Sequence, residues 1–207
     1  MFIDQSYFIG PLTIAQLGQK AVDDKLKDFI SRYEPMIMEA ALGYDFYKAF
    51  LTGIDVGSDE QPEQRWMDLL NGIAFTDIYS VRKRFVGFGN TETKISPLAG
   101  FIYYEYMKDL ASQNTGIGLV KTQGENSVSA NVVSKPVNIF NDSAYQLRAF
   151  WELMQADQQK TTKVYPEFSP DNSIGYRYGV YNHNWFYWNN YQGNESYSFR
   201  TKNTFGI

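Results

Sequence analysis

The sequence contains no cysteine, which excludes disulfides, thiolate nucleophiles and cysteine-ligated metal sites. It contains one histidine, His183, so a Ser-His-Asp or Cys-His arrangement would have to use that single imidazole. His183 stands between two asparagines in a turn-like segment, which favours a hydrogen-bonded structural role. The carboxylates are not grouped at the spacing of a calcium-binding loop. We therefore expect no metal and no other cofactor.

The chain also lacks an excess of basic residues, because 19 Lys and Arg stand against 23 Asp and Glu. A net charge of −4 provides no overall positive field to attract nucleic acid. One basic cluster stands out, at Arg82, Lys83 and Arg84. Its simplest interpretation is a solvated face. The alternative is contact with DNA or an acidic partner, since these charges would add up around a channel formed by many copies.

Long apolar runs are missing as well, so no membrane-spanning segment and no membrane contact are expected. The first ten residues, MFIDQSYFIG, have neither the basic region nor the apolar core of a signal peptide. We expect a soluble protein that is not exported by the standard route. The short motifs GFG at 87–89 and GIG at 116–118 complete no phosphate-binding loop, and they are interpreted as turns.

Apolar periodicity predicts a mainly α fold, a compact bundle of four to five helices. Thr13 and Gln16 have the spacing of a capping box, which places the start of the first helix at Thr13. Pro35 suits the first position of a second helix. The segment 73–95 mixes short helical or extended pieces with a glycine-rich turn. The expected helices span about 13–33, 35–53, 62–72, 97–112 and 136–160.

Two further segments complete the expected organisation. Residues 115–133 place β-branched side chains around a Gly-Glu-Asn turn, which predicts a β-hairpin-like insertion. Residues 161–207 combine many aromatics with few charges, which predicts an extended, β-rich or irregular C-terminal arm. We therefore divide the chain into a helical domain, 1–160, and an aromatic-rich arm, 161–207.

Aromatic residues make up 17% of the chain, and aromatic side chains are enriched at protein interfaces. The predicted helix 97–112 has aromatics on more than one face, among them Phe101 and Tyr104. A helix that is apolar nearly all round is buried on most sides, which suggests a subunit contact in addition to a core. Trp151 lies on the apolar seam of helix 136–160. These three residues are predicted interface residues.

The stretch GVYNHNWFYWNNYQGN, 179–194, has two interpretations. Exposed aromatics beside asparagines are typical of a carbohydrate-binding face. Aromatics that dock on a neighbour are typical of an assembly interface, because large rigid side chains lose little rotamer entropy. The helical character of the rest favours the second interpretation, with strand addition onto a neighbour as one mode of docking. Its expected anchors are Trp185, Phe186, Trp188 and Tyr191.

A third class of function is a carboxylate-based hydrolase. Glu105 and Asp109, four residues apart on the aromatic helix, are the candidate carboxylate pair for such a glycosidase. Carboxylates at that spacing more commonly form a solvated strip or pair with Lys and Arg. We expect no enzymatic activity.

Several segments resemble structural proteins of tailed phages: LKDFISRYEPMIMEAALGYDFYKAFLTG (26–53), QRWMDLLNG (64–72), FIYYEYMKDL (101–110) and TGIGLVKTQGENS (115–127). Over about 10–160 the chain resembles head–tail connector (head-completion, adaptor) proteins, most closely those of crAss-like and other Bacteroidetes phages. These motifs are packing patterns, and they transfer no catalytic residue.

The resemblance implies a virion protein of the phage neck that assembles in the host cytoplasm. It implies a homo-oligomeric ring, expected to be a dodecamer, that joins the portal protein to other neck or tail proteins. Genomic DNA would pass through the ring without sequence recognition, and Arg82, Lys83 and Arg84 would be candidates for lining the channel. The alternative function is a carbohydrate-binding or host-recognition protein that uses the C-terminal aromatics.

Overall fold

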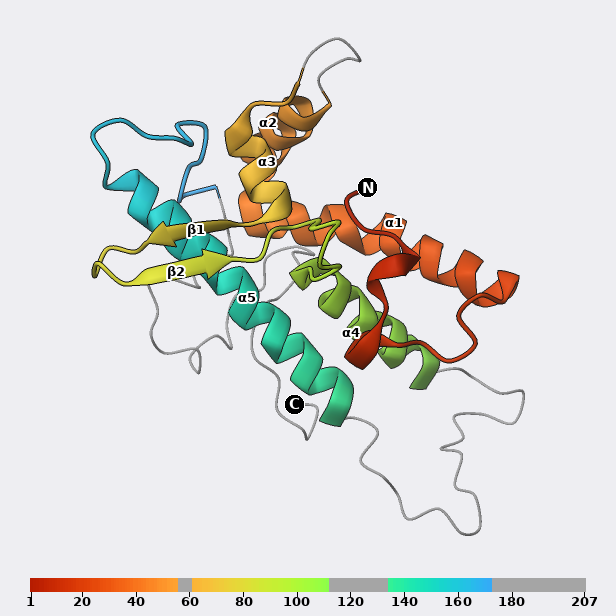
Figure 1. The fold of residues 1–207 in the computed structure, drawn as a ribbon. Coiled ribbons are helices and arrows are strands. Elements are labelled where there is room, and N and C mark those ends of the chain that lie inside the picture. Colours follow the sequence, from red (N-terminus) through yellow and green to blue (C-terminus); the bar gives the residue numbers. More distant parts are fainter. Residues whose placement is uncertain (56–60, 112–133, 173–207) are drawn as a thin grey trace.

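The structure is a computed structural model, and it describes residues 1–55, 61–111 and 134–172. Within these residues the protein is mainly helical, with one small antiparallel sheet, which confirms the predicted fold class (Figure 1). Two short 3-10 turns, η1 (Gln5–Tyr7) and η2 (Gly10–Leu12), precede the first helix. The main elements are α1 (Lys20–Leu42), α2 (Tyr44–Ile54), α3 (Gln64–Asn71), β1 (Ile73–Thr76), β2 (Arg82–Phe85), α4 (Pro97–Ala111) and α5 (Ser134–Gln158).

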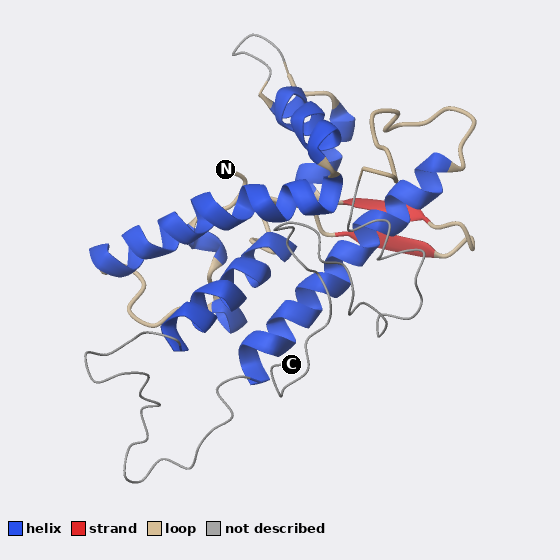
Figure 2. Ribbon diagram, turned by 180° about the vertical axis from the view of Figure 1, so that it is seen from behind, coloured by secondary structure: helices blue, strands red, loops and turns tan. Residues whose placement is uncertain are grey.

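Helix α4 lies between the two longest helices, α1 and α5 (Figure 2). Every residue from Pro97 to Tyr103 is buried, because both neighbouring helices and η2 pack against α4. A Cβ atom on Gly100 would overlap the hydroxyl of Ser143, so this glycine permits the close approach of α4 to α5. The core of a single protomer therefore accounts for the apolar surface of α4 that we had expected to bind a second subunit.

The N-terminal helix boundaries differ from the prediction. Thr13 does not cap a helix, because its hydroxyl donates to the carbonyl of Gly10 at 2.8 Å. Helix α1 begins at Lys20 and continues through Pro35, which occupies an exposed position. Apolar side chains on the opposite side of that turn, including Ile37, are fully buried, and this packing outweighs the proline's cost to the helix. The break comes instead at Gly43, whose φ of 81° favours glycine.

Helix α2 therefore starts at Tyr44 and not at the expected Pro35, whereas α3, α4 and α5 have ends within about two residues of expectation. The segment that the sequence left unassigned contains the sheet, in which Ile73 pairs with Phe85 and Thr76 with Arg82. This hairpin lies against α5, and its turn is on the side of the body opposite the start of α1 (Figure 1). The hairpin predicted at 115–133 lies outside the described residues.

The first part of the predicted arm belongs to the helical body. Tyr165 and Phe168 are buried in the common core. Arg65 of α3 donates to the carbonyl of Val164 at 3.1 Å and to the carboxylate of Glu167 at 2.8 Å. At the end of α5, the buried carboxylate of Asp157 accepts the amides of residues 164 and 165. Packing therefore continues past the expected boundary at 160 to about residue 172, and 173–207 lie outside the described residues.

Much of the aromatic content is used inside the protomer. The indole nitrogen of Trp151 donates to the carbonyl of Ala41 at 3.1 Å, which joins α5 to the end of α1. A cluster of rings in mostly tilted or edge-on contact joins α2, α3, β2, α5 and the segment 161–172. Its members are Phe46, Phe50, Trp66, Phe85, Phe88, Phe150, Tyr165 and Phe168.

Candidate docking surface at the β1–β2 hairpin

The turn between β1 and β2 is held by one carboxylate. Asp77 Oδ1 accepts the backbone amides of Tyr79 at 2.9 Å and Val81 at 2.8 Å. The amide of Asp77 donates to the carbonyl of Val81 at 2.9 Å, and the amide of Ser80 donates to the carbonyl of Asp77 at 3.0 Å. Ser80 has a φ of 62°, and these bonds hold it in that left-handed conformation. Four hydrogen bonds therefore define the backbone conformation of this turn.

Lys83 connects this turn to helix α5. Its ammonium lies 2.9 Å from Asp77 Oδ2 and 2.9 Å from Glu152 Oε2. Glu152 also pairs with Arg148, at 3.1 Å from Nε to Oε1. The hydrogen bond from Lys83 holds the pKa of Asp77 below its usual value, with help from the two turn amides. The bonds to Asp77 and Glu152 in turn raise the pKa of Lys83, so both groups stay charged near neutral pH.

Around this charged network the hairpin and α5 present two aromatic side chains to solvent. Tyr79, in the turn, is 74% exposed, and Tyr145, on α5, is 76% exposed. Tyr145 precedes Arg148 by three residues and therefore shares its helix face. Between the turn and the helix lies a hollow of about 50 Å³, room for little more than a water molecule. It is lined by Asp77, Ile78, Tyr79, Lys83, Arg148, Glu152 and Gln155.

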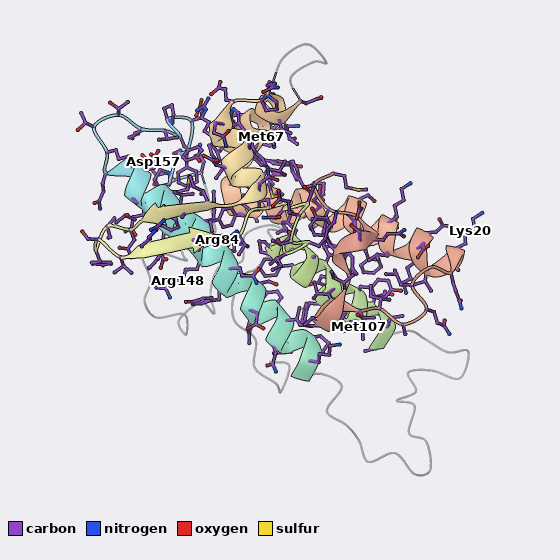
Figure 3. All side chains as sticks on the ribbon, in the orientation of Figure 1. Lys20, Met67, Arg84, Met107, Arg148 and Asp157 are labelled. Carbon is purple, nitrogen blue, oxygen red and sulfur yellow. The ribbon has the colours of Figure 1, made fainter. Side chains whose placement is uncertain are left out.

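The three adjacent basic residues do not form one patch. Side chains alternate along a strand, so Arg82 and Arg84 project outward. Lys83 points the other way, toward α5, and pairs with the carboxylates of Asp77 and Glu152. Opposite the two arginines stand the small exposed residues Ala74 and Thr76. Figure 3 marks Arg84 on the hairpin and Arg148 on the neighbouring helix. We call this surface the hairpin face: residues 73–85 together with Tyr145, Arg148, Glu152 and Gln155.

The predicted interface residues occupy different places. Phe101 and Trp151 are 0% and 1% exposed, so they are core residues, and neither presents a surface to a partner. Tyr104 is half-buried and meets Phe140 edge-on, with ring centres 5.0 Å apart. Helical periodicity identified all three as packing residues, but the packing of Phe101 and Trp151 is within the protomer. The four remaining candidates, Trp185, Phe186, Trp188 and Tyr191, lie outside the described residues, as does His183.

The carboxylates considered for hydrolysis both pair with lysines. Asp109 Oδ2 lies 2.7 Å from the ammonium of Lys25, and Glu105 Oε2 lies 3.1 Å from that of Lys108. Among residues 1–55, 61–111 and 134–172, no three His, Cys, Asp or Glu side chains come together as metal ligands. In the same part of the chain no helix combines the length and apolar character needed to cross a membrane.

Sequence reasoning missed the main features of this surface, Asp77, Tyr79 and Tyr145. A signal for the turn was present, because an aspartate just before a tight turn often accepts amides two residues further on. Nothing in the sequence showed that Arg148 and Glu152 of α5 would lie beside that turn. Comparisons with protein-family models, with curated proteins and with solved structures found no match to this chain. The geometry of the hairpin face therefore comes from the structure alone.

Proposed function

We propose that this chain is a structural assembly protein, a subunit of a ring in the neck of a tailed phage that joins the portal to the tail. The sequence resemblance over about 10–160 suggests this role, and the mainly helical fold is compatible with it. In this proposal the ring surrounds the DNA exit channel, and DNA passes without sequence recognition. The protein has no catalytic step and no cofactor, and it assembles in the host cytoplasm before becoming part of the virion.

The observation that supports an assembly role most directly is the locked hairpin turn. A tyrosine that is 74% exposed costs little to bury against a partner if its backbone is already fixed. Tyr and Arg are the side chains most enriched among residues that dominate binding energy at interfaces, and this hairpin presents Tyr79, Arg82 and Arg84 together. A turn held by four hydrogen bonds, with its largest side chain in solvent, suits recognition of another protein surface.

The remaining parts of the proposal concern partners. The ring is proposed to be a dodecamer that contacts the portal protein and other neck or tail proteins, without membrane contact. Residues 173–207 are proposed to dock on a neighbouring protein through Trp185, Phe186, Trp188 and Tyr191. Of the three basic residues proposed near DNA, only Arg82 and Arg84 project outward, because Lys83 is occupied by Asp77 and Glu152.

The test is the mass of the protein, alone and with its proposed partner, the portal protein. We expect particles whose mass is about twelve times 23.9 kDa, seen as rings in electron micrographs, either spontaneously or once the portal is added. A protein that remains monomeric at high concentration and binds no portal would contradict the proposal. The carbohydrate-binding alternative rests on 179–194, outside the described residues, and no structural observation favours it; glycan-array binding lost on Trp185→Ala would revive it.

A further inference from the structure

We propose that the hairpin face binds a different, acidic surface of a second copy of this chain, the acidic end, so that copies associate head to tail. This inference rests on the proposed function and specifies which surfaces form the contact between subunits. The acidic end is defined as residues 44–55 and 63–71, which contain α2 and α3, together with residues 161–172, which are attached to them through Arg65 and Asp45. Figure 1 shows the α2–α3 pair projecting from the body and the hairpin lying along α5, so the two surfaces are distinct, as a head-to-tail contact requires.

Charge complementarity between the two surfaces is the first argument. The hairpin face carries four basic and two acidic side chains, a net charge of +2 in a chain whose total is −4. The acidic end carries six acidic and three basic side chains, a net charge of −3. Opposite charges at this level steer partners and set their register. The acids of that end are Asp45, Asp55, Glu63, Asp68, Glu167 and Asp171, and its bases are Lys48, Arg65 and Lys163.

The free arginines make this contact specific. Within the hairpin face, Lys83 and Arg148 already pair with Asp77 and Glu152. Arg82 and Arg84 project outward and form no ion pair within the part of the chain that the structure describes. An exposed guanidinium offers five donors in a planar fork that matches a carboxylate in two places at once. The net positive charge of the hairpin face is thus carried by two side chains that can donate hydrogen bonds to carboxylates of a partner.

Exposed aromatics on both surfaces supply the apolar part of the contact. The hairpin face presents Tyr79 and Tyr145, and the acidic end presents Tyr44, which is 57% exposed and adjacent to Asp45. These three are the most exposed aromatic side chains of the described residues. Dominant residues of one partner tend to pair with those of the other, in a centre from which water is excluded. A contact between copies that buries all three tyrosines would remove the most exposed aromatic side chains of the described residues from water.

The experiment reverses charge on each surface of the full-length chain. One variant carries Arg82→Glu and Arg84→Glu; the other carries Asp45→Lys and Asp55→Lys. All four side chains are exposed, so both variants should fold, which circular dichroism checks. Mass photometry and sedimentation at low salt should show self-association at least about tenfold weaker for each variant alone. An equimolar mixture should assemble like the wild type, because each reversed surface then meets its complement.

A matched control and a second probe make the result specific. Lys20→Glu with Lys27→Glu changes the net charge by the same amount as the arginine variant, on exposed positions of α1, and should assemble normally. Tyr79→Ser should weaken association without changing charge. Because screening shortens electrostatic reach to about 10 Å at 0.1 M salt, wild-type association should fall as salt rises.

Three outcomes would contradict the inference, and they are distinguishable. If the arginine variant forms the same rings as the wild type, or the mixture fails to restore assembly, the inference is wrong while the ring proposal stands. If the wild type does not self-associate even near millimolar concentration and binds no portal, both are wrong. Binding of the hairpin face only to portal, with normal self-association of the variants, also overturns the contact between copies.

Discussion

Replacing Tyr7 with Phe should stabilise the protein, although it removes a polar atom from a well-packed site. Tyr7 closes η1 and is 2% exposed, with the ammonium of Lys94 4.8 Å from its ring centre. Its hydroxyl is buried and meets no hydrogen-bond partner among the described residues. Folding therefore takes this hydroxyl out of water without compensation, while a phenylalanine would fill nearly the same space.

The magnitude follows from the cost of an unpaired polar group. A buried donor or acceptor without a partner costs about 1–3 kcal/mol, and the replacement gives up only the few dispersion contacts of one oxygen atom. We expect Tyr7→Phe to raise the free energy of unfolding by about 1 kcal/mol. For a chain of this length that corresponds to a rise in Tm of about 2–4 °C.

Tyr165→Phe is the matched control, because it removes the same atom from an equally buried side chain. The Tyr165 hydroxyl donates to the carbonyl of Arg65 at 3.2 Å. Its loss should lower the free energy of unfolding by about 1 kcal/mol. Urea titrations followed by circular dichroism give both values. The reasoning is refuted if Tyr7→Phe destabilises the protein as Tyr165→Phe does, since that would show that the Tyr7 hydroxyl has a partner.

An alkaline titration tests the same reasoning independently. Burial, with smaller contributions from Asp4 and Glu34, raises the pKa of Tyr7. When folding raises the pKa of a group, the unfolded chain loses that group's proton at a lower pH than the folded protein does. The free energy of unfolding is therefore unaffected below the unfolded pKa, about 10 for tyrosine, and falls as pH rises above it. The wild type should therefore lose stability above about pH 10 relative to Tyr7→Phe, so that the advantage of the variant grows.

Three further predictions follow from other contacts. Burial raises the pKa of Glu34, whose carboxylate accepts the backbone amides of residues 2 and 3. As pH rises above about 4.3, the ordinary pKa of glutamate, urea titrations should show the wild type losing stability relative to Glu34→Gln. A difference between the two proteins that stays constant with pH would contradict this. A Cβ atom at Gly53 would overlap the Trp66 indole, so Gly53→Ala should cost about 1–3 kcal/mol in denaturant titrations, although alanine favours helices; a gain would show that the ring moves freely. Arg65→Met should release residues 161–172 from α3 and speed cleavage after Lys163 by a lysine-specific protease, whereas unchanged cleavage would mean that Tyr165 and Phe168 hold the segment alone.

The start of α1 shows where local signals fail. Thr13 followed by Gln16 has the spacing of a capping box, yet the structure begins the helix at Lys20 and carries it through Pro35. A cap contributes about 1 kcal/mol, so burial of several large side chains elsewhere on the helix easily outweighs it. The apolar stripe of a helix indicates approximately which residues are helical. Its first and last residues depend on competing contacts with other elements.

The hairpin face shows a different limit. The run Arg82, Lys83, Arg84 predicted a basic cluster, but strand pairing sends its middle residue to the opposite side, where Asp77 and Glu152 neutralise it. Glu152 is 69 residues away in the chain. No local pattern contains that information, so the division of the cluster into two outward-facing arginines and one lysine paired with carboxylates required the structure.

By itself, the sequence determined the mainly helical class, the positions of α3, α4 and α5, and the absence of cysteine chemistry, because residue types and apolar periodicity are local properties. Only the tertiary structure decided what each apolar surface packs against. Periodicity showed that Phe101 and Trp151 face a packed interior, and the structure located that interior within one protomer. The physical reason is that the hydrophobic effect depends on the area removed from water and not on which chain covers it.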